Sequence, residues 1–277
     1  MITSSIVLYR NTKEECRSIL DCLLASPVEK IFLVDHSGDE NLAVLKDYSP
    51  KLEYIPHENL GYGSGHNLAI KKAIEMQSDY HLILNADVLF SPDVVGEMAA
   101  FMEKHSDIGI LVPKVFYPDG RLQYTCKLSP NMWDMFSRRF LPGFLKSRHD
   151  YFFTMQQIGY DNMMLVPFVS GCFVMLSVSA AKTIGLFDER FFMYYEDVDL
   201  GRRMLSRYKN IYYPKVSIIH DHGDGSRKKM KMFLIHVQSQ LRYFRKWGFL
   251  FDRERKKINQ YAISWSTEHK GALDYEQ

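Results

Sequence analysis

The feature that most constrains the fold is the alternation, in the first half of the chain, of short apolar runs with segments of helical periodicity. Runs rich in β-branched and aromatic residues predict strands, and apolar residues at helical spacing predict the helices between them. We expect strands at residues 4–9, 30–34, 52–55, 80–84 and 108–112, and helices at residues 14–24, 68–76 and 92–104. Strands separated by single helices predict an α/β fold with a mostly parallel sheet that is covered on both faces.

The second half of the chain is less regular. Between about residues 113 and 167, aromatic and polar residues mix without a clear period, and we expect long loops there. Beyond them we expect a strand at 168–176, a helix at 179–184, a helix start near Glu196 and a long helix at 229–247. We therefore divide the chain into an α/β catalytic domain, residues 1–226, and a basic, aromatic-rich helical C-terminal extension, residues 227–277.

Composition narrows the class of protein and its surroundings. Hydrophobic residues make up 46% of the 277 residues and charged residues 25%, which is ordinary for a globular protein with a core. The longest apolar run, residues 163–176, is interrupted and is shorter than the roughly 20 residues that cross a bilayer. The N-terminus lacks the pattern of a signal peptide. Four cysteines without CxxC spacing predict no zinc site and a reducing compartment, so we expect a cytoplasmic protein.

Charge is unevenly distributed along the chain. Residues 227–257 carry eleven Lys and Arg against two acids, whereas the whole chain has a formal net charge of only +2. A basic tail on an acidic body predicts contact with an anionic partner. We expect the apolar stripe of the tail helix to pack on the catalytic domain, and its basic face and the aromatic cluster at 247–251 to contact an anionic membrane surface. A contact between copies in a homo-oligomer is the alternative, and no nucleic-acid-binding module accompanies the charge.

Two candidate nucleotide-binding segments come directly after expected strands, where ligands bind in parallel α/β sheets. Asp35 ends the second strand and could accept a hydrogen bond from a nucleobase or ribose, or simply close a turn. The glycine-rich segment 59–67 leads into a helix, so its backbone N–H groups could approach a phosphate, although a tight connection would also use these glycines. His66 stands where the dinucleotide fingerprint has its third glycine, which disfavours an NAD-linked oxidoreductase.

Asp87 and His220 are candidate metal ligands. Asp87 follows an apolar strand, and an unpaired carboxylate near a strand end favours a cation as its partner, although a turn or helix cap is the alternative. His220 ends the apolar run VSIIH and could be a ligand or a structural residue. We expect the neighbouring His222 to matter less.

The segment 196–199 places three carboxylates within four residues, near an expected helix start. Stabilisation of the helix dipole explains part of this pattern, and Asp199 also has Arg203 at the i,i+4 position. Neither explanation accounts for the aromatic and methionine residues 191–195 that lead into the acids. Crowded acids beside an apolar wall have raised pKa values, which suits a general base.

Taken in order, several segments resemble the family 2 glycosyltransferases, especially the bacterial rhamnosyltransferases and galactofuranosyltransferases. The matching segments are NLGYGSGHN, LNADV, GCFVMLSVSAAKTIGLFDERFFMYYEDVDLGRRM and IIHDHGDGS, all within residues 1–226. The block around FFMYYEDVDL is specific, whereas the glycine segment alone would not be. The resemblance implies a GT-A fold and an inverting transfer of sugar from a nucleotide-diphosphate sugar, such as dTDP-rhamnose or a UDP-hexose. The acceptor it implies is a hydroxyl of a glycan or of a polyprenyl-linked acceptor in cell-surface polysaccharide synthesis.

The resemblance also implies a set of donor-binding residues. They are Tyr9, Asp35, Asn59, Gly61, Tyr62, Gly63, Asn67, Asn85, Ala86 and Asp87. The triplet at 85–87 stands where the family has its metal-binding Asp-x-Asp motif, with Asn85 in place of the first acid. Asp87 and His220 are therefore implied as the protein ligands of a divalent metal, Mg2+ or Mn2+, which prefers oxygen-rich sites.

In the EDVDL motif, Asp197 corresponds to the catalytic base and Glu196 to its neighbour. The acceptor-binding residues that the resemblance implies are Gly171, Asp188 and Glu196. The base would deprotonate the acceptor hydroxyl as it attacks the anomeric carbon, and a single displacement of this kind inverts the anomeric configuration. The asparagine at position 85 leaves open a catalytically silent protein that only binds nucleotide sugars.

Overall fold

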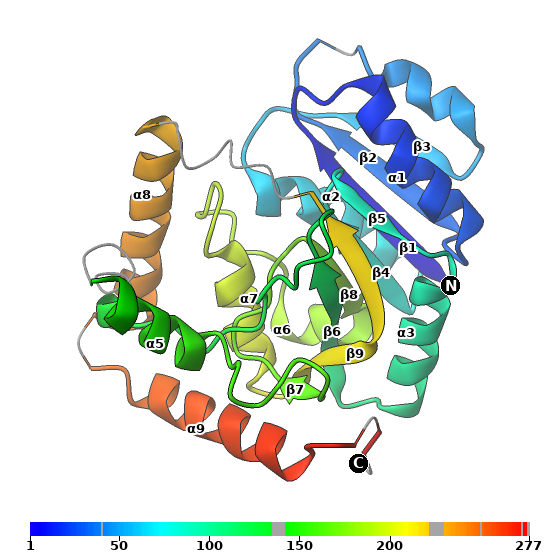
Figure 1. Ribbon diagram of the computed structural model, residues 1–277. Coiled ribbons are helices and arrows are strands. Elements are labelled where there is room, and N and C mark those ends of the chain that lie inside the picture. The colour runs from blue at the N-terminus through cyan, green and yellow to red at the C-terminus, as the bar shows by residue number, and fades with distance from the viewer. Residues whose placement is uncertain (40, 135–141, 222–229, 250, 273, 276–277) are drawn as a thin grey trace.

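The computed structural model describes residues 1–39, 41–134, 142–221, 230–249, 251–272 and 274–275. Its strands are β1 (Ile2–Leu8), β2 (Lys30–Asp35), β3 (Leu52–Pro56), β4 (Tyr80–Leu84), β5 (Val88–Phe90), β6 (Ile108–Phe116), β7 (Met164–Leu165), β8 (Phe173–Ser177) and β9 (Lys209–His220). They form one sheet in the order β3-β2-β1-β4-β8-β6-β9-β5, and β7 pairs with β9 (Figure 1). β1, β2, β3, β4, β6 and β9 run in one direction, which confirms the mostly parallel α/β sheet.

Helices cover both faces of this sheet. They are α1 (Lys13–Ala25), α2 (Tyr62–Glu75), α3 (Asp93–Lys104), α5 (Gly143–Phe153), α6 (Val178–Ile184), α7 (Glu196–Met204), α8 (Met230–Trp247), α9 (Arg253–Glu268) and the 3-10 helix η1 (Ala43–Tyr48). The apolar sides of α1 and α3 share one core cluster with the strands, whereas those of α2, α6 and α7 share another. Among the described helices, none is long and apolar enough to cross a membrane.

The expected elements of the first half are all present, and β4 has the bounds predicted for it. The main difference is α2, which begins at Tyr62 instead of residue 68 because the glycines lie inside its first turn. A Cβ on Gly63 would lie 2.9 Å from the Phe187 Cβ, and a Cβ on Gly65 would lie 2.7 Å from the Val7 Cγ2. The glycines allow the first turn of α2 to approach its neighbours closely.

The loosely patterned region 113–167 contains more regular structure than expected. It includes the last residues of β6, the helix α5 and the short strand β7. Of the twelve-residue strand β9, only the final run VSIIH was recognised in the sequence. β9 matters for the site because it ends at His220, beside β5.

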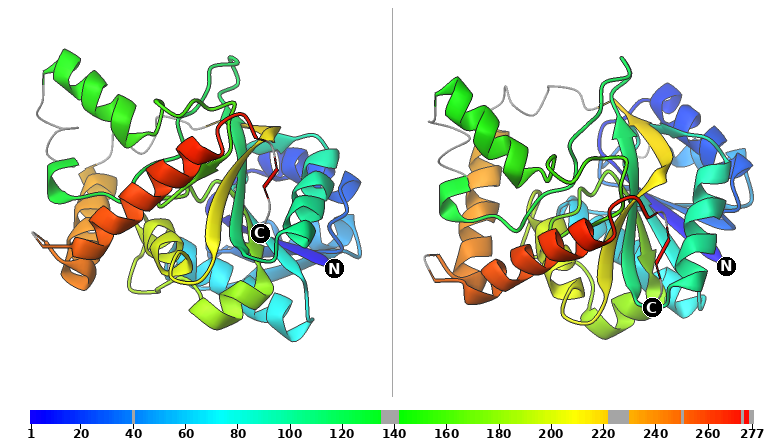
Figure 2. Two further views of the ribbon diagram at one scale, coloured as in Figure 1. Left: turned by 90° about the horizontal axis from the view of Figure 1, so that it is seen from below. Right: turned by 60° about the horizontal axis from the view of Figure 1, so that its bottom comes forward.

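The C-terminal extension packs on the catalytic domain. Tyr243 and Phe244 of α8 join a cluster with Phe191 and Tyr195, which precede α7, so the expected packing is present at the C-terminal end of the helix. Phe233 and Leu241, which the helical spacing also assigns to the packed stripe, are 42% and 49% exposed. Trp265 of α9 is buried in the core cluster that includes α1 and α3. Figure 1 shows α9 below the sheet, and in Figure 2 the same helix, orange to red, crosses in front as it runs from α8 toward the C-terminus. The boundary between residues 226 and 227 lies outside the described residues, as does His222.

Candidate active site

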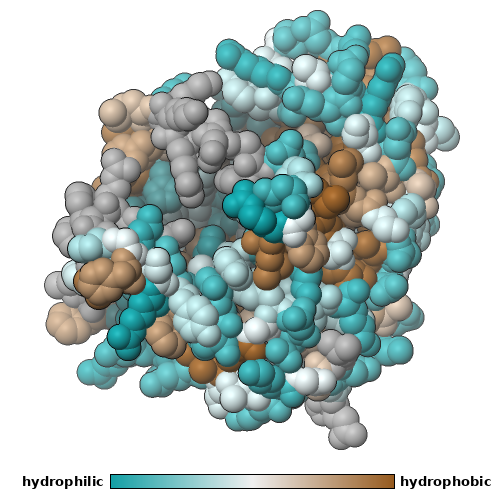
Figure 3. Space-filling model, in the orientation of Figure 1, coloured by the Kyte–Doolittle hydropathy of each residue, from teal (hydrophilic) through white to brown (hydrophobic). Residues whose placement is uncertain are grey.

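The predicted donor residues lie at one edge of the sheet. β1, β2, β4 and β9 run in the same direction, so their carboxyl ends meet at the same edge, where open α/β sheets bind ligands. Tyr9, Asp35 and Asn85 stand at the ends of β1, β2 and β4, and His220 ends β9. On the face drawn in Figure 3, the surface forms a hydrophilic hollow between α8 and the sheet.

Asp87 and His220 are brought together by the pairing of β5 with β9, in which Val88 lies opposite His220. The Asp87 Oδ1 atom is 3.4 Å from the His220 Nε2 atom. The Asp87 side chain is 45% exposed and that of His220 only 7%. This corner of the sheet therefore presents an accessible carboxylate beside a nearly buried imidazole.

Gln123 fixes the orientation of the imidazole. Its Nε2 donates to the backbone carbonyl of His220 at 2.7 Å, and its Oε1 lies 3.2 Å from the His220 Nδ1. An amide oxygen only accepts, so Nδ1 carries the proton and Nε2 faces Asp87. Burial lowers the pKa of His220, but hydrogen bonds with Asp87 and Cys172 raise it to about 10. Gln123 was missed in the sequence because it lies in the region without a readable period.

The Asp87–His220 pair fits a divalent cation that the substrate helps to hold. The two side chains offer one oxygen ligand and, once a cation displaces the Nε2 proton that the raised pKa of His220 implies, one nitrogen ligand. The described residues contain no cluster of three or more His, Cys, Asp or Glu side chains. Mg2+ commonly takes one or two protein ligands and completes its shell with phosphate oxygens and water. The Asn85 Oδ1 lies 3.2 Å from the Tyr62 hydroxyl oxygen, so Tyr62 is the contact of this amide oxygen.

A chain of short contacts joins this corner to Asp197. The Asn85 Nδ2 lies 3.4 Å from the His220 Nε2. The Tyr62 hydroxyl, which contacts Asn85, also donates to the Gly171 carbonyl at 2.7 Å, and the Gly171 N–H donates to the Asp197 Oδ2 at 3.2 Å. The structure therefore brings residues 62, 85, 87, 171, 197 and 220, predicted from four separate segments, into one continuous site.

Glu196 and Asp197 begin α7 and differ in their surroundings. The Asp197 Oδ1 accepts the Val198 N–H at 2.8 Å, whereas the Glu196 Oε2 is buried without a hydrogen-bond partner among the described residues. Burial raises the pKa of Asp197, and the N–H groups of Val198 and Gly171 oppose that rise. Burial and the charge of Asp197 raise the pKa of Glu196 well above its usual range. These directions favour protonation of Glu196 before Asp197, an order that suits Asp197 as a general base.

The backbone just before these acids is strained. Tyr194 and Tyr195 have φ angles of +69° and +68°, a left-handed conformation that non-glycine residues rarely adopt. Helix α8 holds this segment, because Ser239 Oγ donates to the Met193 carbonyl at 2.7 Å and Gln240 Nε2 donates to the Tyr195 hydroxyl at 2.8 Å. No sequence pattern predicts this support, because it joins residues more than forty positions apart.

Three predicted donor positions have structural partners. The Asp35 carboxylate accepts from the Ser37 N–H at 2.8 Å and from the Tyr54 hydroxyl at 2.7 Å, which is the turn-closing alternative. A Cβ on Gly61, whose φ is +111°, would overlap the Phe192 carbonyl. Packing thus explains Gly61 and Gly63, and the roles of all three in nucleotide binding stay predictions.

The other predicted positions are less involved in the contact chain. The Asn67 amide bonds to the backbone N–H and carbonyl of Phe187 and to the Glu189 carboxylate, so it holds the turn before α7. Tyr9 is 51% exposed, and Asn59 is half-buried. These positions lie around the site without a contact that assigns them a role.

Asp188 is bound by cations and lies outside the contact chain. Its carboxylate accepts from the Arg190 Nε at 2.8 Å and from the Lys246 Nζ at 2.8 Å. Hydrogen bonds from Arg190 hold the pKa of Asp188 well below its usual range. The structure thus gives Asp188 a role in binding α8 to the catalytic domain, and its acceptor role stays a prediction.

Solved structures that resemble this chain are GT-A glycosyltransferases. Mannosyltransferase PcManGT from Pyrobaculum calidifontis, in complex with GDP-Man and Mn2+, matches with a TM-score of 0.62 at 15% identity, over 98% of this chain and 73% of its own. GalNAc-T7 with UDP, GalNAc and Mn2+ matches with a TM-score of 0.57 at 12% identity, over 96% of this chain and 56% of its own. At these identities the likeness shows the fold, which is the GT-A fold expected from the sequence.

Curated relatives are nearer in sequence. N-acetylglucosaminyl-diphospho-decaprenol L-rhamnosyltransferase of Mycobacterium tuberculosis is 26% identical over 204 residues, which are 70% of this chain and 66% of the relative. This chain thus spans about two thirds of that protein's length. Rhamnosyltransferase WbbL of Escherichia coli (strain K12) is 25% identical over 264 residues, 92% of this chain and 97% of the relative. The sequence model of glycosyl transferase family 2 matches residues 4–185, and the chain belongs to that family.

Proposed function

We propose that this glycosyltransferase moves a sugar from a nucleotide-diphosphate sugar to a hydroxyl of a polyprenyl-linked glycan acceptor, with inversion at the anomeric carbon. The observation that carries the proposal is the chain of contacts from Asp87 and His220 through Tyr62 and Gly171 to Asp197. This arrangement supports a cation-binding role for one end of the site and a proton-accepting role for the other, the two functions that transfer from a diphosphate leaving group uses. The names of the curated relatives favour dTDP-rhamnose over a UDP-hexose as donor and a diphosphate-linked lipid as acceptor.

Asp87 and His220 would hold a divalent metal ion, Mg2+ or Mn2+. When bound, the ion supplies positive charge that stabilises the leaving nucleoside diphosphate. The exposed Asp87 carboxylate leaves room for phosphate oxygens, and Gln123 keeps the imidazole turned toward it. Two solved structures with the same fold contain Mn2+, which supports the choice of ion.

Asp197 would accept the proton of the acceptor hydroxyl. The N–H groups of Val198 and Gly171 each bond one of its two oxygens and fix the plane of the carboxylate. The raised pKa of Glu196 favours its neutral form, which would leave Asp197 without a second negative charge beside it, while burial raises the pKa of Asp197 itself. Attack by the deprotonated hydroxyl in a single displacement would invert the anomeric configuration.

A thermal-shift panel of nucleoside diphosphates and their sugars, with and without Mn2+, tests the donor half of this proposal. A ligand at a hundredfold excess over its Kd stabilises the folded protein by about 2.7 kcal/mol. We expect a shift with one nucleoside diphosphate that is lost in EDTA, followed by sugar transfer with the matching donor. The absence of a metal-dependent shift with every nucleotide would contradict the proposal.

We also propose a cytoplasmic protein that contacts the anionic inner face of the plasma membrane through its C-terminal extension. Phe249 and Phe251 follow α8 and are 46% and 91% exposed. Aromatic side chains next to basic residues favour the interface of an anionic bilayer. In co-sedimentation, binding should require anionic lipid, and Phe251→Ser should reduce it. Binding that ignores both changes would contradict the proposal, and a homo-oligomer contact would then explain the exposed rings.

A further inference from the structure

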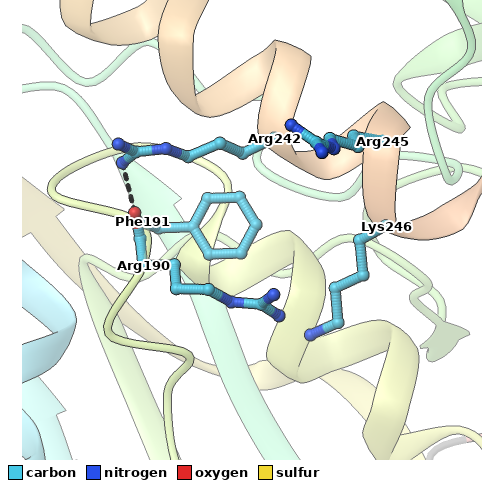
Figure 4. A pocket seen from close by; sticks show the side chains of 5 residues that line it. All are labelled: Arg190, Phe191, Arg242, Arg245 and Lys246. Carbon is cyan, nitrogen blue, oxygen red and sulfur yellow. Dashed lines mark hydrogen bonds between the residues drawn. The ribbon is translucent and has the colours of Figure 1, made fainter.

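A cationic pocket lies between α8 and the segment that precedes α7. It is a cavity of about 570 Å3, lined by Arg190 and Phe191 from that segment and by Arg242, Arg245 and Lys246 from α8. Figure 4 shows the Phe191 ring between the side chains of Arg242 and Arg190. Four cationic side chains from two distant parts of the sequence therefore converge on one cavity.

Acidic neighbours compensate only part of this charge. Asp188 accepts from Arg190 and Lys246, both at 2.8 Å. Asp199 is fully buried and is shared between Lys246 at 2.7 Å and Arg203 at 2.8 Å. Three cationic side chains therefore share two carboxylates, and the pocket contains two further arginines.

The two remaining arginines carry uncompensated charge. The Arg242 guanidinium donates to the backbone carbonyl of Arg190, which is neutral. Arg245 is exposed, and no described acidic side chain lies within ion-pair distance of either arginine. With these two included, the described cations that line the pocket or pair with its acids outnumber the described carboxylates by three. Such an excess in one cavity favours a multiply charged anion over single surface ion pairs.

The pocket is connected to the active site without being part of its contact chain. Arg190 and Phe191 belong to the same segment as Glu196 and Asp197. The next residue, Phe192, accepts the Tyr62 N–H at 2.9 Å, and Tyr62 contacts Gly171. An anion held in the pocket would therefore lie against the backbone that positions the catalytic acids.

We propose that this pocket binds the diphosphate group of the lipid-linked acceptor, an inference that rests on the function proposed above. Guanidinium groups match phosphate oxygens with paired hydrogen bonds, and a diphosphate offers enough oxygens for two arginines and a lysine. A cavity of this volume exceeds the needs of a diphosphate and leaves space for the first atoms of its substituents. Arg245 is the side chain left most free for the ligand.

Direct binding of inorganic diphosphate to the full-length protein in EDTA tests the pocket. EDTA removes the divalent ion on which diphosphate binding at the donor site depends. We expect saturable binding by calorimetry, about tenfold weaker in Arg245→Gln because one charged hydrogen-bonding group is lost. Arg17→Gln is the matched control, since Arg17 lies on α1 and is also exposed. Equal affinities for Arg245→Gln and the wild type, or no binding at low salt, would overturn the proposal.

Acceptor kinetics identify the source of the phosphate. Arg245→Gln should raise KM for a lipid-diphosphate-linked sugar about tenfold relative to KM for the same sugar on an uncharged alkyl chain. Arg17→Gln should leave that ratio unchanged. If Arg245→Gln instead reduces binding to phosphatidylglycerol vesicles and leaves the ratio unchanged, the pocket binds a lipid headgroup and the acceptor assignment is wrong. If diphosphate binding depends on Arg245 but the protein has no transferase activity, the pocket binds diphosphate as proposed and the proposed function is wrong.

Discussion

Asp87 lies at an exposed corner of the sheet beside an imidazole, whereas Asp197 lies at the start of α7 beside the buried Glu196. An exposed carboxylate is in contact with water and can bind a cation at a small cost of desolvation. In a buried pair one member holds a proton more tightly, so the other can stay ionised without a second negative charge beside it. Asp87 and Asp197 carry the same functional group, and the differences in their burial and in their neighbouring side chains give them different expected roles.

The largest effect should come from removing the buried proton acceptor. Asp197→Asn keeps the size of the side chain, but its single amide oxygen can accept only one of the Val198 and Gly171 N–H groups, and the amide cannot take a proton. We expect kcat to fall by about 10²-fold or more, the usual scale for a general base, with donor binding retained. Steady-state kinetics and thermal shift with the donor measure the two properties. Near-wild-type turnover would contradict the role of Asp197.

The next effect concerns the exposed corner. Asp87→Ala and His220→Ala should each weaken metal-dependent binding of the nucleoside diphosphate by about tenfold or more, since ligand-shell changes have effects of this size. Asp161→Ala is the control, because Asp161 is 94% exposed and forms only a surface ion pair with Lys114. Calorimetry with Mn2+ measures the loss. Transfer activity that survives EDTA would remove the metal from the mechanism.

A smaller effect should follow from loosening the support of the acids. Gln240→Ala removes the hydrogen bond to the Tyr195 hydroxyl in the strained segment before α7. Loss of one hydrogen bond corresponds to about 1 kcal/mol, so we expect kcat to fall by about fivefold with donor KM unchanged. Gln238→Ala, on the exposed side of the same helix, is the matched control. An equal loss in both variants would indicate a general weakening of α8.

The smallest effect on turnover, and the sharpest on pH dependence, is expected for Glu196→Gln, which mimics the protonated acid. The raised pKa means that the folded protein binds this proton more tightly than the unfolded chain does. Stability of the wild type is therefore lost as the pH rises from the ordinary carboxyl range toward the raised pKa.

We expect the Tm difference between Glu196→Gln and the wild type to shift in favour of the variant with rising pH. A change of 1 kcal/mol corresponds to about 2–4 °C in a domain of this size. Thermal unfolding of both proteins between about pH 4 and pH 8 measures this Tm difference. Asp197 is present in both proteins, so the substitution changes only the residue at position 196. A difference that stays constant across this range would show that Glu196 titrates normally.

The sequence predicts those parts of the fold and site that carry their own pattern. Each early strand and helix has a local period. The Asn85–Asp87 segment directly follows β4, and the Glu196–Asp197 segment begins α7. β5 has only three residues and shows no period, and Gln123 lies in an irregular region. Local patterns of this kind are sufficient to identify the elements but not the contacts between them.

The glycines of α2 show a further limit of sequence analysis. A glycine next to a phosphate and a glycine next to another backbone satisfy the same requirement for close approach. Gly61 and Gly63 meet Phe192 and Phe187, from a segment more than 120 residues away. The strain at Tyr194 and Tyr195 likewise depends on α8. Contacts between distant segments determine both the role of these glycines and the strain at the two tyrosines, and a single sequence does not reveal such contacts.

The dependence of Tyr194 and Tyr195 on α8 has a consequence for protein synthesis. The strands that form the donor edge lie N-terminal to residue 221, and domains tend to fold from the N-terminus as they leave the ribosome. The side chains that hold the segment before Asp197 come only at positions 239 and 240. A nascent chain could therefore bind its nucleotide before its base is in place. We expect such an incomplete chain to bind a donor without transferring its sugar.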